Sequence, residues 1–148
     1  MSVTVRRAIA ADLDAVAPLF DAYRQFYGQP SDAGRAHAWL SERMQAGESV
    51  VLIAERDGQP SGFVQLYPMF SSVRTARLWI LNDLFVASAA RRCGVARALL
   101  DEAAQFARND GAAGLMLETG RDNAPARALY RAAGWQEDAS QWYSLPLR

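Results

Sequence analysis

Residues 86–100 read VASAARRCGVARALL, and this stretch decides the fold of the chain. It leads from the end of an apolar run, through a loop of small residues, into a helix rich in alanine and leucine. A helix that begins here presents unpaired N–H groups and the positive end of its dipole, and both attract a phosphate group. The junction has the pattern R-x-x-G-x-A, formed by Arg91, Arg92, Cys93, Gly94, Val95 and Ala96.

The residue types at this junction favour a bound phosphate. Gly94 has no Cβ and lets the backbone approach a ligand closely. Arg91, Arg92 and Arg97 add positive charge. The usual nucleotide-binding loops are excluded, because the sequence contains neither Gly-Lys-Ser/Thr nor the fingerprint G-x-G-x-x-G. The local sequence therefore predicts a site for a phosphorylated cofactor, with a solvated helix start as the alternative.

Composition limits the function classes. The chain has 148 residues, of which 51% are hydrophobic and 22% are charged, and this is typical of one folded domain. Sixteen basic and sixteen acidic residues give a net charge of zero. We therefore expect a single domain over residues 1–148, with neither nucleic acid nor a membrane as partner.

Cysteine and histidine usage narrows the chemistry further. Cys93 is the one cysteine and His37 the one histidine, which excludes an internal disulfide, a cysteine-based zinc site and a histidine cluster. Cys93 is either a small residue tolerated in the loop or a reactive thiol. No apolar run approaches about 18 residues, and the N-terminus has no secretory pattern. We expect a cytoplasmic protein without a metal site.

Hydrophobic periodicity divides the chain into strands and helices. The predicted strands are residues 3–9, 50–55, 62–67, 77–86, 115–118 and 142–147. The predicted helices are residues 12–28, 32–47, 95–107 and 123–133, and Asp12 is the expected cap of the first. Residues 56–59, RDGQ, are predicted to form a hairpin turn, and residues 68–75 a polar loop or irregular edge. This order indicates a mixed α/β fold with antiparallel strands first and a parallel pair around the helix at 95–107.

The later motifs resemble a known family. After the R-x-x-G-x-A loop, a helix and a strand, the chain reads N-A-x-x-x-x-L-Y-x-x-x-G-W from Asn123 to Trp135. From residue 50 onward this arrangement resembles the GNAT superfamily of acetyl-CoA-dependent N-acetyltransferases. The resemblance implies a central, mostly antiparallel sheet that splays at its parallel pair and is flanked by helices. Residues 80–86, ILNDLFV, and 23–27, YRQFY, look like the branch of fungal histone and polyamine acetyltransferases and their small bacterial relatives.

The resemblance implies a site for acetyl-CoA as co-substrate. The backbone N–H groups from Arg92 to Arg97 would hold the CoA pyrophosphate. The pantetheine arm would lie along the strand end formed by Leu84, Phe85 and Val86, and Asn123 would bond its amide chain. A backbone N–H near Leu84 would polarise the thioester carbonyl.

Two residues are predicted to transfer protons. Tyr130 follows Asn123 by two helical turns, and the resemblance makes it the acid that protonates the departing thiolate; the alternative is a core aromatic. Asp83 is the predicted base, with a structural carboxylate as the equal alternative, and Glu118 is a weaker candidate. Strand alternation places Asp83 with Phe85 on one face and Asn82 with Leu84 on the other.

The acceptor is expected to be the primary amine of a small molecule. Aromatic side chains at Tyr23, Tyr27, Phe70 and Trp79 can receive an aliphatic ammonium, although such residues also form cores. Asn82 stands where relatives of the polyamine branch often carry an acid. The alternatives are a protein lysine or N-terminus as acceptor, and a non-catalytic acyl-CoA sensor. Family members commonly dimerise through late strands, so Trp142 and Tyr143 are expected either at a homodimer interface or in a core.

Overall fold

The structure is a computed structural model that describes residues 2–148. The chain forms two compact units, which we call the sheet unit, up to Glu118, and the C-terminal unit, Thr119–Arg148. The elements are β1 (Val3–Arg7), η1 (Ala10–Asp12), α1 (Leu13–Phe26), α2 (Ala33–Gln45), β2 (Val50–Arg56), β3 (Gln59–Ser71), β4 (Ala76–Val86), η2 (Ser88–Ala90), α3 (Val95–Asp110), β5 (Gly114–Met116) and α4 (Ala124–Ala132).

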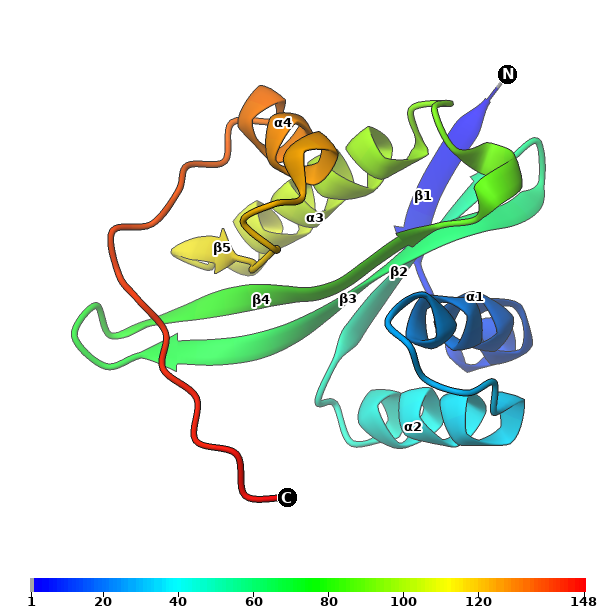
Figure 1. Ribbon diagram of the computed structural model, residues 1–148, viewed down its shortest axis with the longest axis horizontal. Coiled ribbons are helices and arrows are strands. Elements are labelled where there is room, and N and C mark those ends of the chain that lie inside the picture. The colour runs from blue at the N-terminus through cyan, green and yellow to red at the C-terminus, as the bar shows by residue number, and fades with distance from the viewer. Residues whose placement is uncertain (1) are drawn as a thin grey trace. The chain divides into compact units, whose positions relative to one another are not determined.

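The sheet unit is built on one five-stranded sheet in the order β1-β2-β3-β4-β5. The first four strands pair antiparallel, and the hairpin turn predicted between β2 and β3 is confirmed. β5 pairs with β4 in parallel, and α3 provides the crossover that a parallel pair requires. Figure 1 shows α1 and α2 on one face of the sheet and α3 on the other. The mixed α/β fold expected from the sequence is confirmed.

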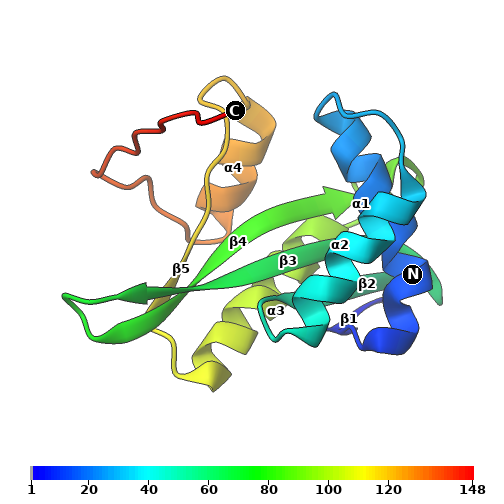
Figure 2. The same ribbon diagram turned by 90° about the horizontal axis from the view of Figure 1, so that it is seen from below.

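The hairpin of β3 and β4 is longer than the sequence predicted. β3 continues to Ser71, which pairs with Ala76, so the first half of residues 68–75, predicted as a polar loop or irregular edge, is regular strand. The β2 ladder ends at Leu66, and Figure 2 shows the hairpin extending beyond the neighbouring strands. Pro68 is tolerated here because a strand edge without a neighbour loses no ladder bond to a missing N–H.

One extra residue in β4 changes the face that its side chains meet. The pairs Gln65↔Asp83 and Leu66↔Leu81 leave Asn82 as the additional residue of a β-bulge. Asp83 consequently lies on the face of α1 and α2, together with Phe85, whose ring meets the ring of Tyr23. Leu81 lies on the α3 face. The predicted alternation therefore holds after the bulge but not across it.

β4 and β5 pair over a short stretch. Their ladder runs from Leu78↔Gly114 to Ile80↔Met116, so the strand predicted at 115–118 begins one residue earlier and ends two residues earlier. Beyond Ile80, the β5 side of β4 has no strand neighbour among the described residues. The sheet therefore splays at its parallel pair, as the resemblance implied, and the end of β4 has a free edge.

A hydrophobic core lies under α1 and α2, where apolar residues of both helices pack on Ile53 and Phe63 of the sheet. The connection between the helices is held by Asp21, whose carboxylate accepts from the Asp32 N–H at 2.8 Å and the Ser31 hydroxyl at 2.7 Å. These two bonds lower the pKa of Asp21. They fix the connection that follows the aromatic end of α1.

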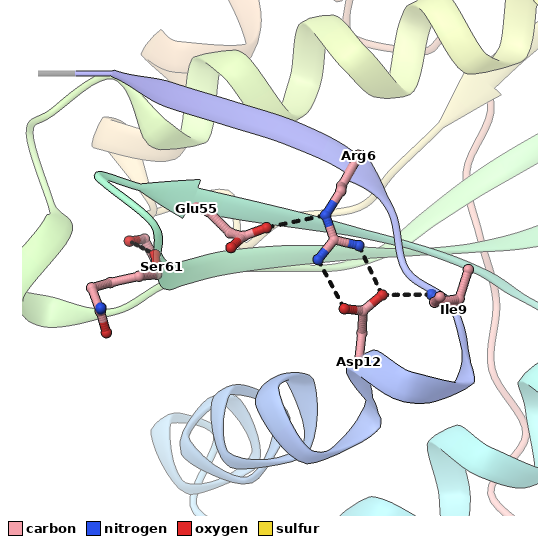
Figure 3. A network of polar contacts seen from close by, with 6 residues as sticks. Arg6, Ile9, Asp12, Glu55 and Ser61 are labelled. Atoms are coloured by element: carbon pink, nitrogen blue, oxygen red, sulfur yellow. Dashed lines mark hydrogen bonds and ion pairs between the residues drawn. The ribbon is translucent and has the colours of Figure 1, made fainter.

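A second network of hydrogen bonds joins β1, η1 and β2 (Figure 3). The Arg6 guanidinium donates to both Asp12 oxygens at 2.8 Å and to Glu55 at 3.1 Å. Asp12 also accepts from the Ile9 N–H at 2.7 Å. The bond from Arg6, followed by that from Ile9, lowers the pKa of Asp12 to about 2. Asp12 stands at the predicted cap position, but within residues 2–148 its side chain bonds back toward β1 and makes no cap bond to α1.

The C-terminal unit contains α4 and an irregular tail. Asn123 caps α4, because its side-chain oxygen accepts from the Ala126 N–H at 3.4 Å. Residues 136–148 form neither helix nor strand, so the strand predicted at 142–147 is wrong. A strand needs a partner for its backbone groups, and this segment joins no ladder in the described chain. Its apolar side chains are 67% to 89% exposed; they are Trp142, Tyr143, Leu145 and Leu147.

None of the helices formed by residues 2–148 combines the length and the hydropathy that crossing a membrane requires.

Candidate active site

The loop before α3 has the backbone geometry of an anion site. Gly94 is the residue before the helix and has a φ of 79°, and Arg92 also has a positive φ, of 63°. Such left-handed residues turn successive N–H groups toward one side, which makes a concavity that binds anions. Within residues 2–148, no side chain caps the first N–H groups of α3. Backbone donors are therefore available where the sequence predicted them.

Gly62 brings this loop close to the end of β4. A Cβ at Gly62 would lie 2.7 Å from the Phe85 carbonyl oxygen and 3.2 Å from Cγ1 of Val95, so a larger residue would push the two apart. Arg91 closes the same junction, because its Nε donates to the Val86 carbonyl at 3.2 Å and its guanidinium lies 5.9 Å from the centre of the Phe85 ring. The free edge of β4 and the start of α3 are therefore neighbours.

The other two arginines and the cysteine of the loop have different surroundings. Arg97 pairs with Asp101 at 3.0 Å, one helical turn further on. Arg92 is exposed. The Cys93 thiol is half-buried and lies 3.5 Å from the Arg91 carbonyl.

Asp83 is a buried carboxylate on the face of α1 and α2, with 5% of its surface exposed. Gln65 Nε2 donates to Asp83 Oδ2 at 2.7 Å, and Asn82 Nδ2 donates to Oδ1 at 3.1 Å. The Tyr23 hydroxyl donates to the Asn82 carbonyl at 3.3 Å. Burial raises the pKa of Asp83, and the hydrogen bonds from Gln65, Tyr23 and Asn82 offset part of that rise. A carboxylate with a raised pKa is a candidate proton acceptor.

Aromatic rings lead from this carboxylate to the surface at the end of α1. The Tyr23 ring meets Phe63 at 5.9 Å, Phe85 at 6.3 Å and Tyr27 at 5.0 Å between centroids. Tyr27 is 64% exposed and forms the outer end of the row. The structure thus brings the predicted residues Tyr23, Tyr27, Asn82 and Asp83 together.

Trp79 does not join this group; it is buried on the α3 face, which is the core role that the sequence left open for it. Its indole donates to Asp110 at 2.9 Å and its ring lies 5.1 Å from Phe106, both on α3. Trp79 precedes the bulge at Asn82 and lies on the α3 face, whereas Asp83 follows the bulge and lies on the face of α1 and α2. Phe70 lies in the outer part of the hairpin and is exposed. Glu118, also exposed, is the last residue of the sheet unit.

The remaining predicted residues belong to the C-terminal unit. Asn123 precedes α4, and Tyr130 follows two turns later as a half-buried side chain. The Tyr130 ring lies 6.2 Å from that of Trp135. The N-A-x-x-x-x-L-Y-x-x-x-G-W motif is therefore one helix with its cap and a closing aromatic contact.

Gln65 is the residue of the Asp83 cluster that sequence reasoning missed. Its side chain is fully buried within the strand sequence GFVQLY. A polar residue inside an apolar strand was the available signal, because a buried amide requires a hydrogen-bond partner.

Tyr67, the next polar residue on β3, accepts from Trp39 Nε1 at 3.2 Å. It lines an open hollow of about 560 Å³ with Arg43 and Glu48. Among residues 2–148, no three metal-ligating side chains come together.

Comparison with known proteins points to one family. Residues 14–135 match the model of the "Acetyltransferase (GNAT) family". A relative from Bacillus subtilis (strain 168), "Uncharacterized N-acetyltransferase YhfO", is 48% identical over 136 residues, which cover 92% of this chain and 91% of that protein.

Solved structures are similar over the whole chain. The crystal structure of a probable acetyltransferase has a TM-score of 0.92 and 40% identity, and the match covers 100% of this chain and 99% of that one. The aminoglycoside N-acetyltransferase AAC(6')-Iy in complex with CoA has a TM-score of 0.81 at 22% identity, with 99% and 96% covered. At that identity the second likeness concerns the fold alone.

Proposed function

The chain belongs to the GNAT acetyltransferase family, and from this premise we propose that it transfers the acetyl group of acetyl-CoA to the primary amine of a small molecule. The observation that carries the proposal is the free edge of β4 beyond Ile80, next to the left-handed loop at the start of α3. A strand edge can bond an amide chain, and a turn of N–H groups can bond a diphosphate.

The residues of the loop and strand fit the parts of acetyl-CoA, which would supply an acetyl group activated as a thioester. The pyrophosphate would be held by backbone N–H groups and by the charge of Arg91 and Arg92. The edge at Leu84, Phe85 and Val86 would bond the pantetheine amides, with a further bond from Asn123. The backbone N–H groups proposed for the pyrophosphate are those of Arg92, Cys93, Gly94, Val95, Ala96 and Arg97.

Two side chains carry the proton transfers in this proposal. Asp83 takes a proton from the acceptor ammonium, directly or through a water molecule, because only the neutral amine is a nucleophile. Tyr130 donates its phenolic proton to the thiolate that leaves, and an N–H near Leu84 stabilises the charge on the acetyl oxygen. The amine attacks the thioester directly, and no covalent intermediate with the protein is required.

The surroundings of Asp83 support an aliphatic ammonium as acceptor. Tyr23 and Tyr27 present aromatic surface, Asn82 presents an exposed amide at the bulge, and Asp83 supplies negative charge. Aromatic faces attract a cation, and a buried carboxylate strengthens that attraction. Glu118 would add a second, exposed acidic contact for an acceptor with more than one amine.

We also infer a homodimer in which a second copy covers the apolar tail. Trp142, Tyr143, Leu145 and Leu147 are exposed, while the alternating pattern of this segment is that of a strand. Burying such side chains against a symmetric partner removes apolar surface from water.

The experiment that tests the function first is titration calorimetry with acetyl-CoA beside ADP as control. We expect micromolar binding of acetyl-CoA and much weaker binding of ADP, because ADP lacks the arm that would pair with β4. Binding would justify a screen of amines by thiol release. A folded sample that binds no acetyl-CoA would contradict the proposal.

A further inference from the structure

Gln65 and Asp83 form a polar pair inside an apolar sheet. They are direct partners in the β3–β4 ladder and are 0% and 5% exposed. Their neighbours on β3 are Val64 and Leu66, both fully buried. Burying an amide and a carboxylate is unfavourable unless each bonds the other. The bond of 2.7 Å between Gln65 Nε2 and Asp83 Oδ2 meets that requirement for one polar atom of each side chain.

The two oxygens of Asp83 have unequal partners. Gln65 donates to Oδ2, and because the Gln65 side chain is fully buried it stays beside Asp83. Oδ1 is bonded at 3.1 Å by Asn82, an exposed residue of the bulge. This bond is longer and less buried than the bond from Gln65, so water or a ligand can replace it more readily. Oδ1 is therefore the oxygen that an incoming group can reach.

We infer that Gln65 is a positioning residue for acetyl transfer: it holds Oδ2 of Asp83 so that Oδ1 meets the acceptor amine at the bulge, where the amine nitrogen replaces the Asn82 amide. The inference rests on the proposed function of Asp83. In the step it serves, one N–H bond of the ammonium breaks and its proton moves to Oδ1. The nitrogen keeps the electron pair, and the carboxylate becomes a carboxylic acid.

Glutamine suits this role because it can bond both protonation states of the carboxyl group. Its NH₂ donates to a carboxylate, and after rotation of the amide its oxygen accepts from a carboxylic acid. The bond to the carboxylate is the stronger of the two because it is charge-assisted, so its loss raises the pKa of Asp83. Within residues 2–148, Gln65 Oε1 has no hydrogen-bond partner of acceptable geometry, so only the bond from Nε2 to the ionised Asp83 opposes that rotation, and protonation of Asp83 weakens it. Methionine has a similar volume but bonds neither state, and glutamate would place a second negative charge beside Asp83.

The groups facing Asp83 from the packed elements are few. β3 presents Gln65 and Tyr67, α1 presents Tyr23, and β4 presents Asn82. From α2, Arg43 acts on Tyr67 rather than on Asp83 directly. Burial raises the pKa of Asp83, and the bond from Gln65 is the largest of the effects that oppose this rise.

A carboxyl titration tests the pair without any substrate. The ¹³C signal of Asp83 would be followed against pH by NMR in the wild type, in Gln65→Met, and in Leu66→Met, a buried neighbour on the opposite face. We expect the Asp83 pKa to rise by about one pH unit or more in Gln65→Met, since a lost bond to a charged group has that effect. Leu66→Met should leave it unchanged. An unmoved Asp83 pKa in Gln65→Met would overturn the inference.

A pH profile of turnover tests the role in the reaction. With an amine that the wild type acetylates, Gln65→Met should move the acidic limb of kcat/KM upward by the same amount as the NMR titration, and Leu66→Met should not. A rate that falls equally at every pH would show a merely structural residue and overturn the inference. If Gln65→Met does not fold, Gln65→Glu replaces it, and the two carboxyls should then titrate as a coupled pair. Absence of turnover in the wild type counts against the proposed function, while the titration still decides the Gln65–Asp83 pair.

Discussion

The sheet unit and the C-terminal unit carry different halves of the proposed chemistry and are built differently. Asp83 lies within a buried set of hydrogen bonds, and the start of α3 packs against Gly62. Tyr130 lies on α4, a helix of nine residues with no buried residue. A short helix gains little stability from itself. Substitutions at the buried site residues of the sheet unit should therefore change stability as well as chemistry, whereas those in the C-terminal unit should change chemistry with little effect on the core.

The largest effect is expected for Tyr130→Phe. Removing the phenolic proton donor should lower kcat by a factor of roughly 100 to 10,000, with the melting temperature and the affinity for acetyl-CoA unchanged. Thiol release and titration calorimetry measure the two quantities. Tyr143→Phe, on the exposed tail, is the matched control and should behave as the wild type. Equal turnover in Tyr130→Phe and wild type would remove Tyr130 as the acid.

Asp83→Asn should lower kcat/KM by about a hundredfold while leaving the fold at least as stable at pH 7. Burial raises the pKa of Asp83, so the native state binds this proton more tightly than the unfolded chain does. The ionised form therefore destabilises the native state above its pKa, and this penalty disappears as the pH falls toward the ordinary value. Melting curves from pH 7 down to pH 4 should show a relative gain for the wild type that Asp83→Asn lacks. A less stable variant at pH 7 would indicate a purely structural carboxylate.

The tail provides a test in the other unit. Replacing Trp142 and Tyr143 together by serine should convert the proposed homodimer to a monomer, since both side chains are exposed in the single chain. Light scattering after size exclusion measures the mass. A wild type that is already monomeric would refute the dimer and leave the tail without a partner.

Gly62→Ala should affect both stability and cofactor binding. The new Cβ would lie 2.7 Å from the Phe85 carbonyl oxygen, and such overpacking costs about 1–3 kcal/mol. Because the displaced atoms belong to the junction of β4 and α3, we expect acetyl-CoA to bind about tenfold more weakly, which corresponds to about 1.4 kcal/mol. Gly114→Ala is the control, since its Cβ would lie 3.9 Å from Leu78. Unchanged affinity in Gly62→Ala would separate the loop from cofactor binding.

The smallest effect is expected for Asp12→Asn. The bond from Arg6 lowers the pKa of Asp12 to about 2 from an ordinary value of 3.8. The carboxylate therefore stabilises the fold above pH 3.8, and this contribution is lost as the pH falls through about 2. At pH 7 the variant should melt a few degrees lower, with turnover unaffected. The same difference at pH 7 and at pH 2 would contradict this account.

Features that depend on neighbouring residues can be predicted from the sequence, and features that depend on the register between strands cannot. The start of α3, the helical crossover to β5 and the start of α4 at Asn123 depend on neighbouring residues, and each was predicted correctly, whereas within residues 2–148 the cap expected from Asp12 does not form. The length of the β3–β4 hairpin, the place of Trp79 and the role of Gln65 depend on the register between strands, which a bulge changes without a local signal. The tail has a strand pattern, but a strand exists only where another backbone pairs with it.

The additional residue at Asn82 has a consequence for how this enzyme can vary. Before it, Trp79 packs on Phe106 of α3; after it, Asp83 and Phe85 face the proposed acceptor. The single additional residue at Asn82 thus separates the side chains that pack on α3 from those that face the proposed acceptor. We therefore expect substitutions after Asn82 to alter the proposed acceptor site without repacking α3. Deletion of a single residue here would turn one set of side chains to the wrong face of the sheet. We therefore expect the bulge to tolerate substitution of Asn82 but not its deletion.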